Sequence, residues 1–433
     1  MNAPSDPNLP LIESARVLID QGQLTEAADV LNRARAQAPN DPRVYLMAGV
    51  MSEKAGNVAG AFQLMRTGLE LAPNWAPGIV VLAQLQARQG QFAEAKENAA
   101  TALQLDSKAR VVLDGAIDVA HLTGDLQQAV TLLQQGLAQQ PTDTKWRLML
   151  ANALSQLDRH EDALLRWDEI LTESPQNEQA LKGRMHTLLA AGRLEDAAVV
   201  TAKLLSLAPD NPVYAYYDAR ANGKTPAHQP AELNRSLFDS AAHIFDQQLV
   251  QGLRYQLPLE VAKKILEIFP DKNFSLLDLG CGTGLLGAQL GKLQGRMVGV
   301  DVSPKMLEQA RRHQLYDSLE VADLHDALAT AERYDVITAL DVCVYVGDLS
   351  QTIPAAWGAL VPGGLLILSC ESGPEDGPDL FLNPATERYV HKRSHVEAQC
   401  RAAGFSVETR DTVLRYQKGK PVHGFVITAR KAV

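Results

Sequence analysis

A period of 34 residues runs through the first half of the chain and constrains its fold more than any other feature. A small residue recurs with that period in six successive registers, at Ala27, Ala61, Ala95, Ala129, Ala163 and Ala197. A glycine recurs at Gly22, Gly56, Gly90, Gly124 and Gly192, with Asp158 in the remaining register. A proline recurs at Pro39, Pro73, Pro141, Pro175 and Pro209, with Ser107 in the remaining register. A constant period without insertions predicts an internal repeat, in which each unit stacks on its neighbours.

Each of the three recurring residue types has a physical role in a helix–turn–helix unit. The small alanine lets two helices cross closely, the glycine closes the first helix, and the proline begins the connection to the next unit. The period and the pattern resemble those of the tetratricopeptide repeat. The resemblance implies a solenoid with a concave groove, because one unit alone cannot bury its apolar face. We expect six repeats and a capping helix over residues 9–220, after a disordered tail over residues 1–8.

Two interpretations of the solenoid remain open. Its groove would bind an extended peptide or a helix of a partner protein, or the repeats would serve only for docking or for a homodimer. Some tetratricopeptide domains hold a terminal carboxylate with lysine and asparagine on the first helices of successive repeats. The corresponding positions of this chain are Leu46, Val80, Asp114 and Leu148, and only Asn152 fits that scheme. We therefore expect a protein or peptide partner, but no carboxylate clamp of that kind.

A polar stretch rich in proline and glycine, residues 222–230, separates the repeats from the second half of the chain. Such a composition is typical of a connection between domains. We assign the linker to residues 221–235. Apolar residues at helical spacing follow it, which predicts a helix before the next domain.

The second half contains a glycine-rich loop between an apolar strand and a helical pattern. The loop reads Asp278-Leu279-Gly280-Cys281-Gly282-Thr283-Gly284. Glycines let a backbone turn tightly and approach a ligand without a clash of Cβ atoms. A second apolar strand ends at Asp301, 21 residues after Gly280. At that spacing a carboxylate at the tip of the second strand can accept both hydroxyls of an adenosine ribose.

Two further strands end in carboxylates as well. A third strand over residues 319–322 precedes Asp323, and a fourth over residues 334–340 precedes Asp341. Ligands bind at the carboxyl edge of an open α/β sheet, so we expect these acids to lie at one site. On this evidence a nicotinamide dinucleotide and S-adenosylmethionine both fit as cofactors. A Rossmann-like domain in which the loop is only a turn would explain Gly280, but not the acids at three strand ends.

The form of the loop separates the two cofactors. It reads G-x-G-x-G, with an aspartate two residues before the first glycine, and this resembles motif I of the class I S-adenosylmethionine methyltransferases. The resemblance extends to residues 360–367, which are similar to the L-x-P-G-G turn of that family, and to a bacterial group of methyltransferases with tetratricopeptide repeats. It implies a helical lid over residues 236–257 and a catalytic domain over residues 258–433. The implied fold is an α/β Rossmann-like domain with a seven-stranded mixed sheet, whose seventh strand is antiparallel and lies between the fifth and the sixth.

The resemblance also assigns the cofactor site. It makes Asp301 the acid that binds the ribose and Asp323 the acid that binds the adenine amino group. Tyr255 would either pack within the lid or contact the methionine moiety. We expect S-adenosyl-L-methionine to be bound by Asp278, Gly280, Cys281, Gly282, Thr283, Gly284, Asp301, Val302, Asp323, Leu324, Asp341 and Tyr255.

Methyl transfer from a sulfonium depends mostly on proximity and orientation, with a base needed only when the acceptor holds a proton at neutral pH. Candidate catalytic residues follow the fourth and fifth strands: Tyr345, Glu371, Tyr389 and His391. His391 has a suitable unperturbed pKa, about 6.5, although a lone histidine is more often a structural residue. Glu371 would hold an amine acceptor or close the pocket. Asp341 is better suited to orienting the methionine end of the cofactor than to accepting a proton.

Composition excludes several classes of partner. The net charge of −10 and the pI near 5.5 argue against general nucleic-acid binding, which depends on neutralising phosphates. No apolar run approaches the ~20 residues that span a bilayer, and the first residues lack the features of a secretory signal. None of the four cysteines forms a C-x-x-C pair, so we expect neither a zinc site nor a disulfide framework. These features together predict a cytoplasmic protein without a metal site.

The leading functional hypothesis is an S-adenosylmethionine-dependent methyltransferase that acts on a protein or peptide side chain presented by the repeat groove. A second hypothesis is a small-molecule or carrier-bound acceptor, with the repeats used for docking. A third is a non-catalytic scaffold, against which the intact Asp278, Asp301 and Asp323 argue. The sequence leaves open whether the acceptor atom is N, O, S or C.

Overall fold

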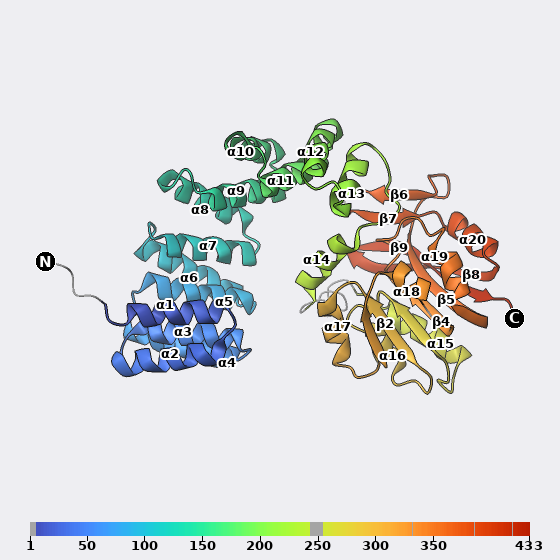
Figure 1. Ribbon diagram of the computed structural model, residues 1–433, viewed down its shortest axis with the longest axis horizontal. Helices are drawn as coiled ribbons and strands as arrows, with labels where there is room; N and C mark the ends of the chain where they lie inside the picture. Colours follow the sequence, from blue (N-terminus) through green and yellow to red (C-terminus); the bar gives the residue numbers. More distant parts are fainter. Residues whose placement is uncertain (1–5, 243–253, 331, 385, 418) are drawn as a thin grey trace. The chain divides into compact units, whose positions relative to one another are not determined.

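The computed structural model describes residues 6–242, 254–330, 332–384, 386–417 and 419–433. The chain divides into two compact units, Met1–Ala191 and Gly192–Val433. The first unit is all helical, and the second contains helices followed by a mixed sheet (Figure 1). The predicted fold class, a helical repeat region before an α/β domain, is confirmed. In the stretches that the structure describes, no helix is both long and apolar enough to span a bilayer.

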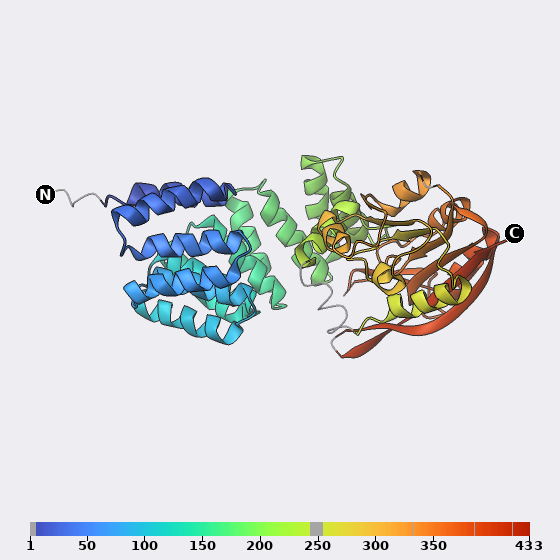
Figure 2. The same cartoon turned by 90° about the horizontal axis from the view of Figure 1, so that it is seen from below.

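The repeats form pairs of antiparallel helices that stack in layers, as the first six helices show in Figure 2. The helices of the first unit are α1 (Leu9–Asp20), α2 (Leu24–Gln37), α3 (Pro42–Lys54), α4 (Val58–Leu71), α5 (Ala76–Arg88), α6 (Phe92–Leu105), α7 (Arg110–Leu122), α8 (Leu126–Gln139), α9 (Thr144–Gln156), α10 (His160–Glu173) and α11 (Glu178–Ala190). The second unit begins with α12 (Leu194–Leu207) and α13 (Pro212–Ala221). The sixth repeat is therefore divided between the two units.

The recurring residues occupy positions that explain their period. All six alanines of the period have 0% exposure, on the even-numbered helices α2 to α12. The recurring glycines follow odd-numbered helices and adopt φ between 71° and 81°. Glycine enters this left-handed region without steric cost. Asp158 adopts φ 57° in the one register without glycine, a conformation that aspartate tolerates better than most residues.

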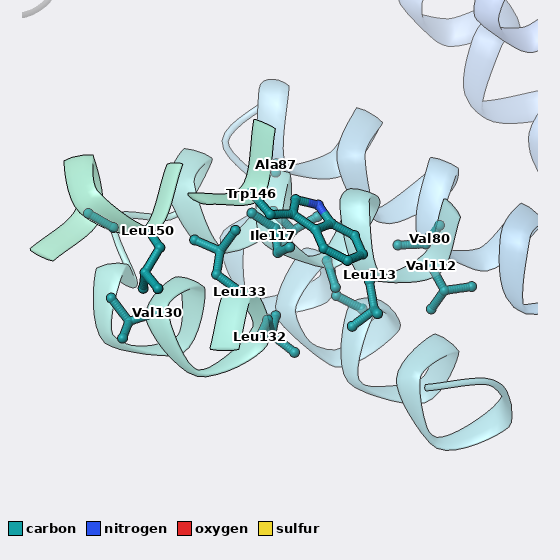
Figure 3. Close-up of a cluster of buried hydrophobic side chains, with 14 of the residues drawn as sticks. Val80, Ala87, Val112, Leu113, Ile117, Val130, Leu132, Leu133, Trp146 and Leu150 are labelled. Carbon is teal, nitrogen blue, oxygen red and sulfur yellow. The ribbon is translucent and has the colours of Figure 1, made fainter. Parts of the chain in front are cut away.

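Side chains from successive repeats share one apolar core (Figure 3). Trp146 of α9 packs with Leu113 of α7 and Leu133 of α8, and its Nε1 donates to Asp114 at 2.6 Å. Gly136 lies against the indole, since a Cβ at this position would come within 2.7 Å of Cζ3 of Trp146. Each repeat therefore completes the core of its neighbour.

The predicted tail overlaps the first repeat. Residues 1–5 lie outside the described residues. Asp6 pairs with Arg43, and Nδ2 of Asn8 donates to Oδ2 of Asp41 at 2.9 Å. Asn8 is buried directly before α1. The described part of this segment is therefore in contact with α3.

The sheet of the second unit has the strand order β3-β2-β1-β4-β5, continued by β9 and then β8. Its strands are β1 (Leu276–Leu279), β2 (Met297–Asp301), β3 (Ser318–Val321), β4 (Tyr334–Ala339), β5 (Leu360–Ser372), β6 (Leu380–Asn383), β7 (Arg388–His391), β8 (Phe405–Gln417) and β9 (Lys420–Lys431). β9 runs antiparallel between β5 and β8, so the predicted place of the seventh strand is confirmed. The β6–β7 hairpin was not predicted, and β7 pairs in parallel with the end of β5.

Helices cover both faces of the sheet. The helices that follow α13 are α14 (Ala231–Ala241), α15 (Leu257–Ile268), α16 (Leu285–Leu290), α17 (Pro304–Arg311), α18 (Leu324–Thr330), α19 (Thr352–Gly358) and α20 (Arg393–Ala402). The alternating residues of β1 divide between two cores. Leu276 packs with α15 and α16, whereas Leu277 packs with α18, α19 and α20. This is the three-layer arrangement of a doubly wound sheet.

The predicted linker is held by the domain that follows it. The backbone N–H of Gln229 donates to the carbonyl of Tyr345 at 3.0 Å, and the N–H of Asp348 donates to the carbonyl of Ala227 at 2.7 Å. The predicted lid, residues 236–257, begins within α14, but residues 243–253 of it lie outside the described residues. The segment after β4 therefore pairs with a stretch more than 100 residues earlier in the chain.

Candidate cofactor and acceptor site

A cavity of about 360 Å³ opens at the carboxyl edge of the sheet, above β1, β2 and β4. The predicted cofactor residues that line it are Tyr255, Asp278, Gly280, Cys281, Gly282, Thr283, Asp301, Val302, Asp323, Leu324 and Asp341. The remaining predicted residue, Gly284, caps the start of α16 instead. Of the predicted catalytic residues only Tyr345 lines the cavity, whereas Glu371, Tyr389 and His391 do not.

The glycine loop follows β1 with three residues in the left-handed region. The φ angles of Gly280, Gly282 and Gly284 are 64°, 56° and 85°. A Cβ on Gly280 would come within 2.3 Å of Cγ2 of Val342, so this position also needs glycine for space. The backbone of the loop can therefore approach a ligand closely.

Asp278 is a buried acid beneath the loop. Its Oδ1 accepts from Oγ1 of Thr338 at 2.7 Å, and its Oδ2 accepts from the hydroxyl of Tyr316 at 2.8 Å. Burial raises the pKa of Asp278 to about 6, although both hydrogen bonds act in the opposite direction. Asp278 therefore connects β1 to β4 and to Tyr316, and its burial favours the protonated form.

Asp301 sits at the tip of β2, where backbone groups orient its carboxylate. Its Oδ2 accepts from the N–H of Gly282 at 2.9 Å, and its Oδ1 accepts from the N–H of Ser303 at 2.8 Å. Burial raises the pKa of Asp301, and the backbone hydrogen bonds oppose this rise. Each oxygen keeps a second lone pair, so the pair of oxygens can accept two hydroxyl groups.

Asp323 follows β3 and is held by its neighbour His325. Oδ1 of Asp323 lies 3.0 Å from Nδ1 of His325 and accepts from the N–H of His325 at 2.8 Å. The hydrogen bond to His325 lowers the pKa of Asp323 and raises the pKa of the histidine. The ring of His228, from the linker, lies with its centre 5.7 Å from that of His325. Two histidines that were not predicted thus stand at this end of the cavity.

A network of acids and arginines lies at the opposite end, above β4 and β5. Nη1 of Arg415 donates to both carboxylate oxygens of Asp341, at 2.6 and 2.7 Å, and Nη2 donates to Glu371. The side chain of Arg415 is 1% exposed. Asp341 has φ 59°, and its N–H donates to Oγ of Ser369 at 2.8 Å. The predicted Asp341 and Glu371 are therefore joined by an arginine that sequence reasoning missed.

Aromatic side chains cover the cavity beside this network. The ring of Phe238 from α14 meets the ring of Tyr345 edge to face, with centres 5.3 Å apart. Burial raises the pKa of Tyr345, and the nearby Arg388 opposes the rise. The Tyr345 hydroxyl is therefore protonated at neutral pH and suits a hydrogen-bond donor better than a base. Tyr255 is buried against the same region, and burial raises its pKa well above the ordinary value.

His391 and Tyr389 point away from the cavity. His391 is 2% exposed, its Nε2 lies 2.8 Å from the carbonyl of Gly347, and burial lowers its pKa to about 4. The hydroxyl of Tyr389 donates to the carbonyl of Pro226 at 2.8 Å. Successive side chains of a strand face opposite sides, so Arg388 lines the cavity while these two residues do not. The geometry gives His391 and Tyr389 structural roles. It does not support the predicted role of either residue as a base.

Sequence reasoning missed the residues that long-range pairing brings to the cavity: His228, Gln229, Asn234, His325, Arg388 and Arg415. A local signal existed only for α14, where Asn234, Leu237 and Phe238 share a helical face. The two arginines carried no such signal, because their orientation depends on partner strands. In the described parts of the chain, no three His, Cys, Asp or Glu side chains are grouped as metal ligands.

Comparisons with known families match both halves of the chain. Residues 277–366 match a family described as a methyltransferase domain. Residues 12–74 and 120–166 match families described as tetratricopeptide repeats.

Curated relatives match about a quarter to a third of the chain. A ubiquinone biosynthesis O-methyltransferase of Cereibacter sphaeroides is 31% identical over 118 residues, which are 26% of this chain and 48% of that protein. The protein of the same description from Hydrogenovibrio crunogenus is 34% identical over 150 residues, which are 32% of this chain and 60% of that protein. The chain thus spans about half the length of the curated relatives that it matches.

Solved structures each resemble about half of the chain. The magnesium protoporphyrin IX methyltransferase of Synechocystis PCC 6803 with bound SAM is 19% identical, with a TM-score of 0.38, over 48% of this chain and 100% of that chain. The pilF protein of Pseudomonas aeruginosa is 17% identical, with a TM-score of 0.40, over 49% of this chain and 97% of that chain.

Proposed function

We propose that this chain, which joins tetratricopeptide repeats to a class I methyltransferase domain, transfers a methyl group from S-adenosylmethionine to a small-molecule acceptor. The observation that carries the proposal is the row of acids around one cavity at the carboxyl edge of the sheet, Asp278, Asp301 and Asp323. Asp301 suits the two hydroxyls of a ribose, and Asp323 suits the amino group of an adenine. A dinucleotide fits less well, since the buried carboxylate of Asp278 below the loop would repel a pyrophosphate.

The cofactor supplies a methyl group on a positively charged sulfur, so the leaving group is already activated. The protein then has to orient the acceptor and exclude water. Tyr345 is suited to donate a hydrogen bond to the acceptor, while Arg415 holds Asp341 in place at the end of β4. Glu371 does not line the cavity and is bound by Arg415, so it positions that arginine rather than taking a proton from the acceptor.

The walls of the cavity favour a small acceptor. Gln229 of the linker and Asn234 and Phe238 of α14 line it on the side away from the sheet. These elements leave less room for an extended peptide than an open groove would. The curated relatives are named as O-methyltransferases of ubiquinone biosynthesis, which also supports a small molecule. A protein side chain is the second candidate, favoured by the repeats, because stacked helical repeats commonly bind other proteins.

Calorimetric titration with S-adenosylmethionine tests the proposal. We expect micromolar binding by the full chain and a loss of about 100-fold in Asp301→Ala, because hydrogen bonds to a charged group contribute ~1.5–3 kcal/mol each. Asp411→Ala, which removes an exposed carboxylate on β8, is the matched control and should bind as the wild type does. Absence of binding by the wild type would overturn the assignment.

A second assay identifies the class of acceptor. The full chain and tritiated S-adenosylmethionine are added to a cell lysate, which is then separated into small-molecule and protein fractions. We expect label in the small-molecule fraction, and Asp301→Ala should abolish it. Label confined to protein would replace the small-molecule proposal with the second candidate.

A further inference from the structure

We propose that Arg415 and Arg388 form an oxyanion subsite, which binds a carboxylate of the ligand at the β4–β5 end of the cavity. The inference rests on the proposed function, because it assumes that the cavity holds the cofactor and the acceptor. Two ligands could supply the carboxylate: the methionine part of the cofactor, or an acidic group on the acceptor itself.

A β-bulge turns Arg415 toward the cavity. Val413 pairs with His423, but Arg415 pairs with Val422, so Leu414 is an extra residue in β8. Leu414 and Arg415 are consecutive and both are buried, which a regular strand with one solvent face would not allow. Bulges commonly redirect a side chain next to a functional site. The local geometry therefore places a charged side chain where the alternation of the strand predicts an outward one.

Arg415 has a donor that its protein partners do not use. Its Nη atoms donate to Asp341 and Glu371, but no group in the described part of the chain accepts from its buried Nε. A buried polar group without a partner costs free energy, so natural structures rarely leave one. Since Arg415 lines the cavity, a ligand atom that accepts a hydrogen bond is the expected partner.

Arg388 adds a second guanidinium to the same place. Its Nη1 lies 3.4 Å from Oε1 of Gln417 and 3.7 Å from Oε1 of Glu371, and both distances exceed the 2.7–3.2 Å of a normal N–H···O bond. Glu371 is thus shared between two arginines. The two guanidinium groups offer more donors than Asp341 and Glu371 can accept, so the surplus favours a ligand rich in acceptor oxygens.

The charges select the kind of oxyanion. A guanidinium matches the planar, two-oxygen geometry of a carboxylate. Asp341 and Glu371 offset the charge of the two arginines, so a doubly charged phosphate would meet more repulsion than a singly charged carboxylate. A monoanionic carboxylate therefore fits this subsite best.

Two calorimetric arms separate the possible sources of the carboxylate. The first compares S-adenosylhomocysteine with 5′-methylthioadenosine, which lacks the amino-acid part, on the wild type, Arg415→Lys and Arg388→Lys. In the second, benzoate and its neutral counterpart benzamide are each titrated into protein that is already saturated with S-adenosylhomocysteine. Lysine keeps the positive charge beside Asp341 and Glu371 but loses the planar fork, and a thermal melt checks that each variant is folded. Arg410→Lys, on an exposed part of the same strand, is the control.

If the cofactor supplies the carboxylate, both site variants weaken S-adenosylhomocysteine roughly tenfold or more and leave 5′-methylthioadenosine unchanged. If the acceptor supplies it, benzoate binds the saturated wild type, benzamide does not, and both variants lose benzoate. The subsite is overturned if the arginine variants change the affinities for both nucleosides equally and the wild type does not bind benzoate. If the wild type binds neither nucleoside, the proposed function itself fails, which is a different result.

Discussion

The ionised carboxylate of Asp278 lowers the free energy of unfolding, although the residue lines the cavity where the cofactor is expected. Its pKa of about 6 lies above the ordinary value of an aspartate, so the native state binds its proton more tightly than the unfolded state does. The ionised form therefore destabilises the fold above pH 6, and this cost disappears as pH falls through 6 toward 4. We expect Asp278→Asn to raise the free energy of unfolding at pH 7.5 by about 1–3 kcal/mol.

Chemical denaturation at pH 7.5 and pH 5 checks this expectation. The gain of Asp278→Asn over the wild type should shrink at the lower pH, because the wild-type acid is then protonated. The same variant should bind S-adenosylmethionine more weakly at pH 7.5. A variant equally destabilised at both values would show that the hydrogen bonds from Thr338 and Tyr316 outweigh the burial of the charge.

His391 changes the stability of the fold with pH in the opposite direction to Asp278. Burial lowers its pKa to about 4, so the unfolded state binds the proton more tightly and stability falls as pH drops from 6.5 toward 4. We expect His391→Gln to remove this part of the pH dependence and to cost about 1–3 kcal/mol at pH 7.5, since the contact with Gly347 weakens. Cofactor affinity should be unchanged. An unchanged melt with abolished methyl transfer would restore the role of base.

At the scale of elements, the segment after β4 is held between the linker and β7. Tyr345 lies in this segment, whose backbone pairs with Gln229 on one side and with Tyr389 on the other. Arg220 of α13 anchors the arrangement, because its Nη1 pairs with Glu387 directly before β7 at 2.5 Å. α13 is therefore linked to the wall of the cavity by a short chain of contacts.

We expect Arg220→Gln to weaken the backbone pairing between the linker, the segment after β4 and β7. Amide hydrogen exchange should rise in residues 226–229 and 344–348, since both segments depend on the anchor at Glu387. Arg193→Gln is the control, because it breaks an exposed ion pair between Asp196 of α12 and the residue just before that helix, and it should leave the exchange of both segments unchanged. If amide exchange in these segments is unchanged in Arg220→Gln, the backbone hydrogen bonds hold the linker and the segment after β4 together without the ion pair.

At the scale of the molecule, two compact units with separate cores predict two unfolding transitions. S-adenosylmethionine at 100 times its Kd should stabilise only the transition of the second unit, by about 2.7 kcal/mol. Ala129→Leu should lower the other transition by about 1–3 kcal/mol, because it overfills a fully buried position between helices. Differential scanning calorimetry measures both effects. One cooperative transition shifted by both changes would contradict the independence of the units.

The sequence by itself determined the features that depend on local pattern. The period of alanine and glycine predicts the helical repeats because each unit meets only its neighbours, and the helices α1 to α13 follow it. Asp278 was found from the motif of the glycine loop, whereas Asp301 and Asp323 were found because they lie at or just after the ends of parallel strands, which meet at one edge of a sheet. The predicted third and fourth strands, residues 319–322 and 334–340, agree with β3 and β4 to within one residue, whereas neither α18 nor the β6–β7 hairpin was predicted.

Only the tertiary structure decided which polar side chains reach the β4–β5 end of the cavity. Arg388 faces the cavity while Tyr389 and His391 face away, because β7 pairs with β5 in one register. Arg415 faces inward because of one extra residue in β8, and His228 arrives with a linker that pairs with the segment after β4. Strand register and long-range backbone pairing depend on two segments at once, so they cannot be predicted from the sequence of either segment alone.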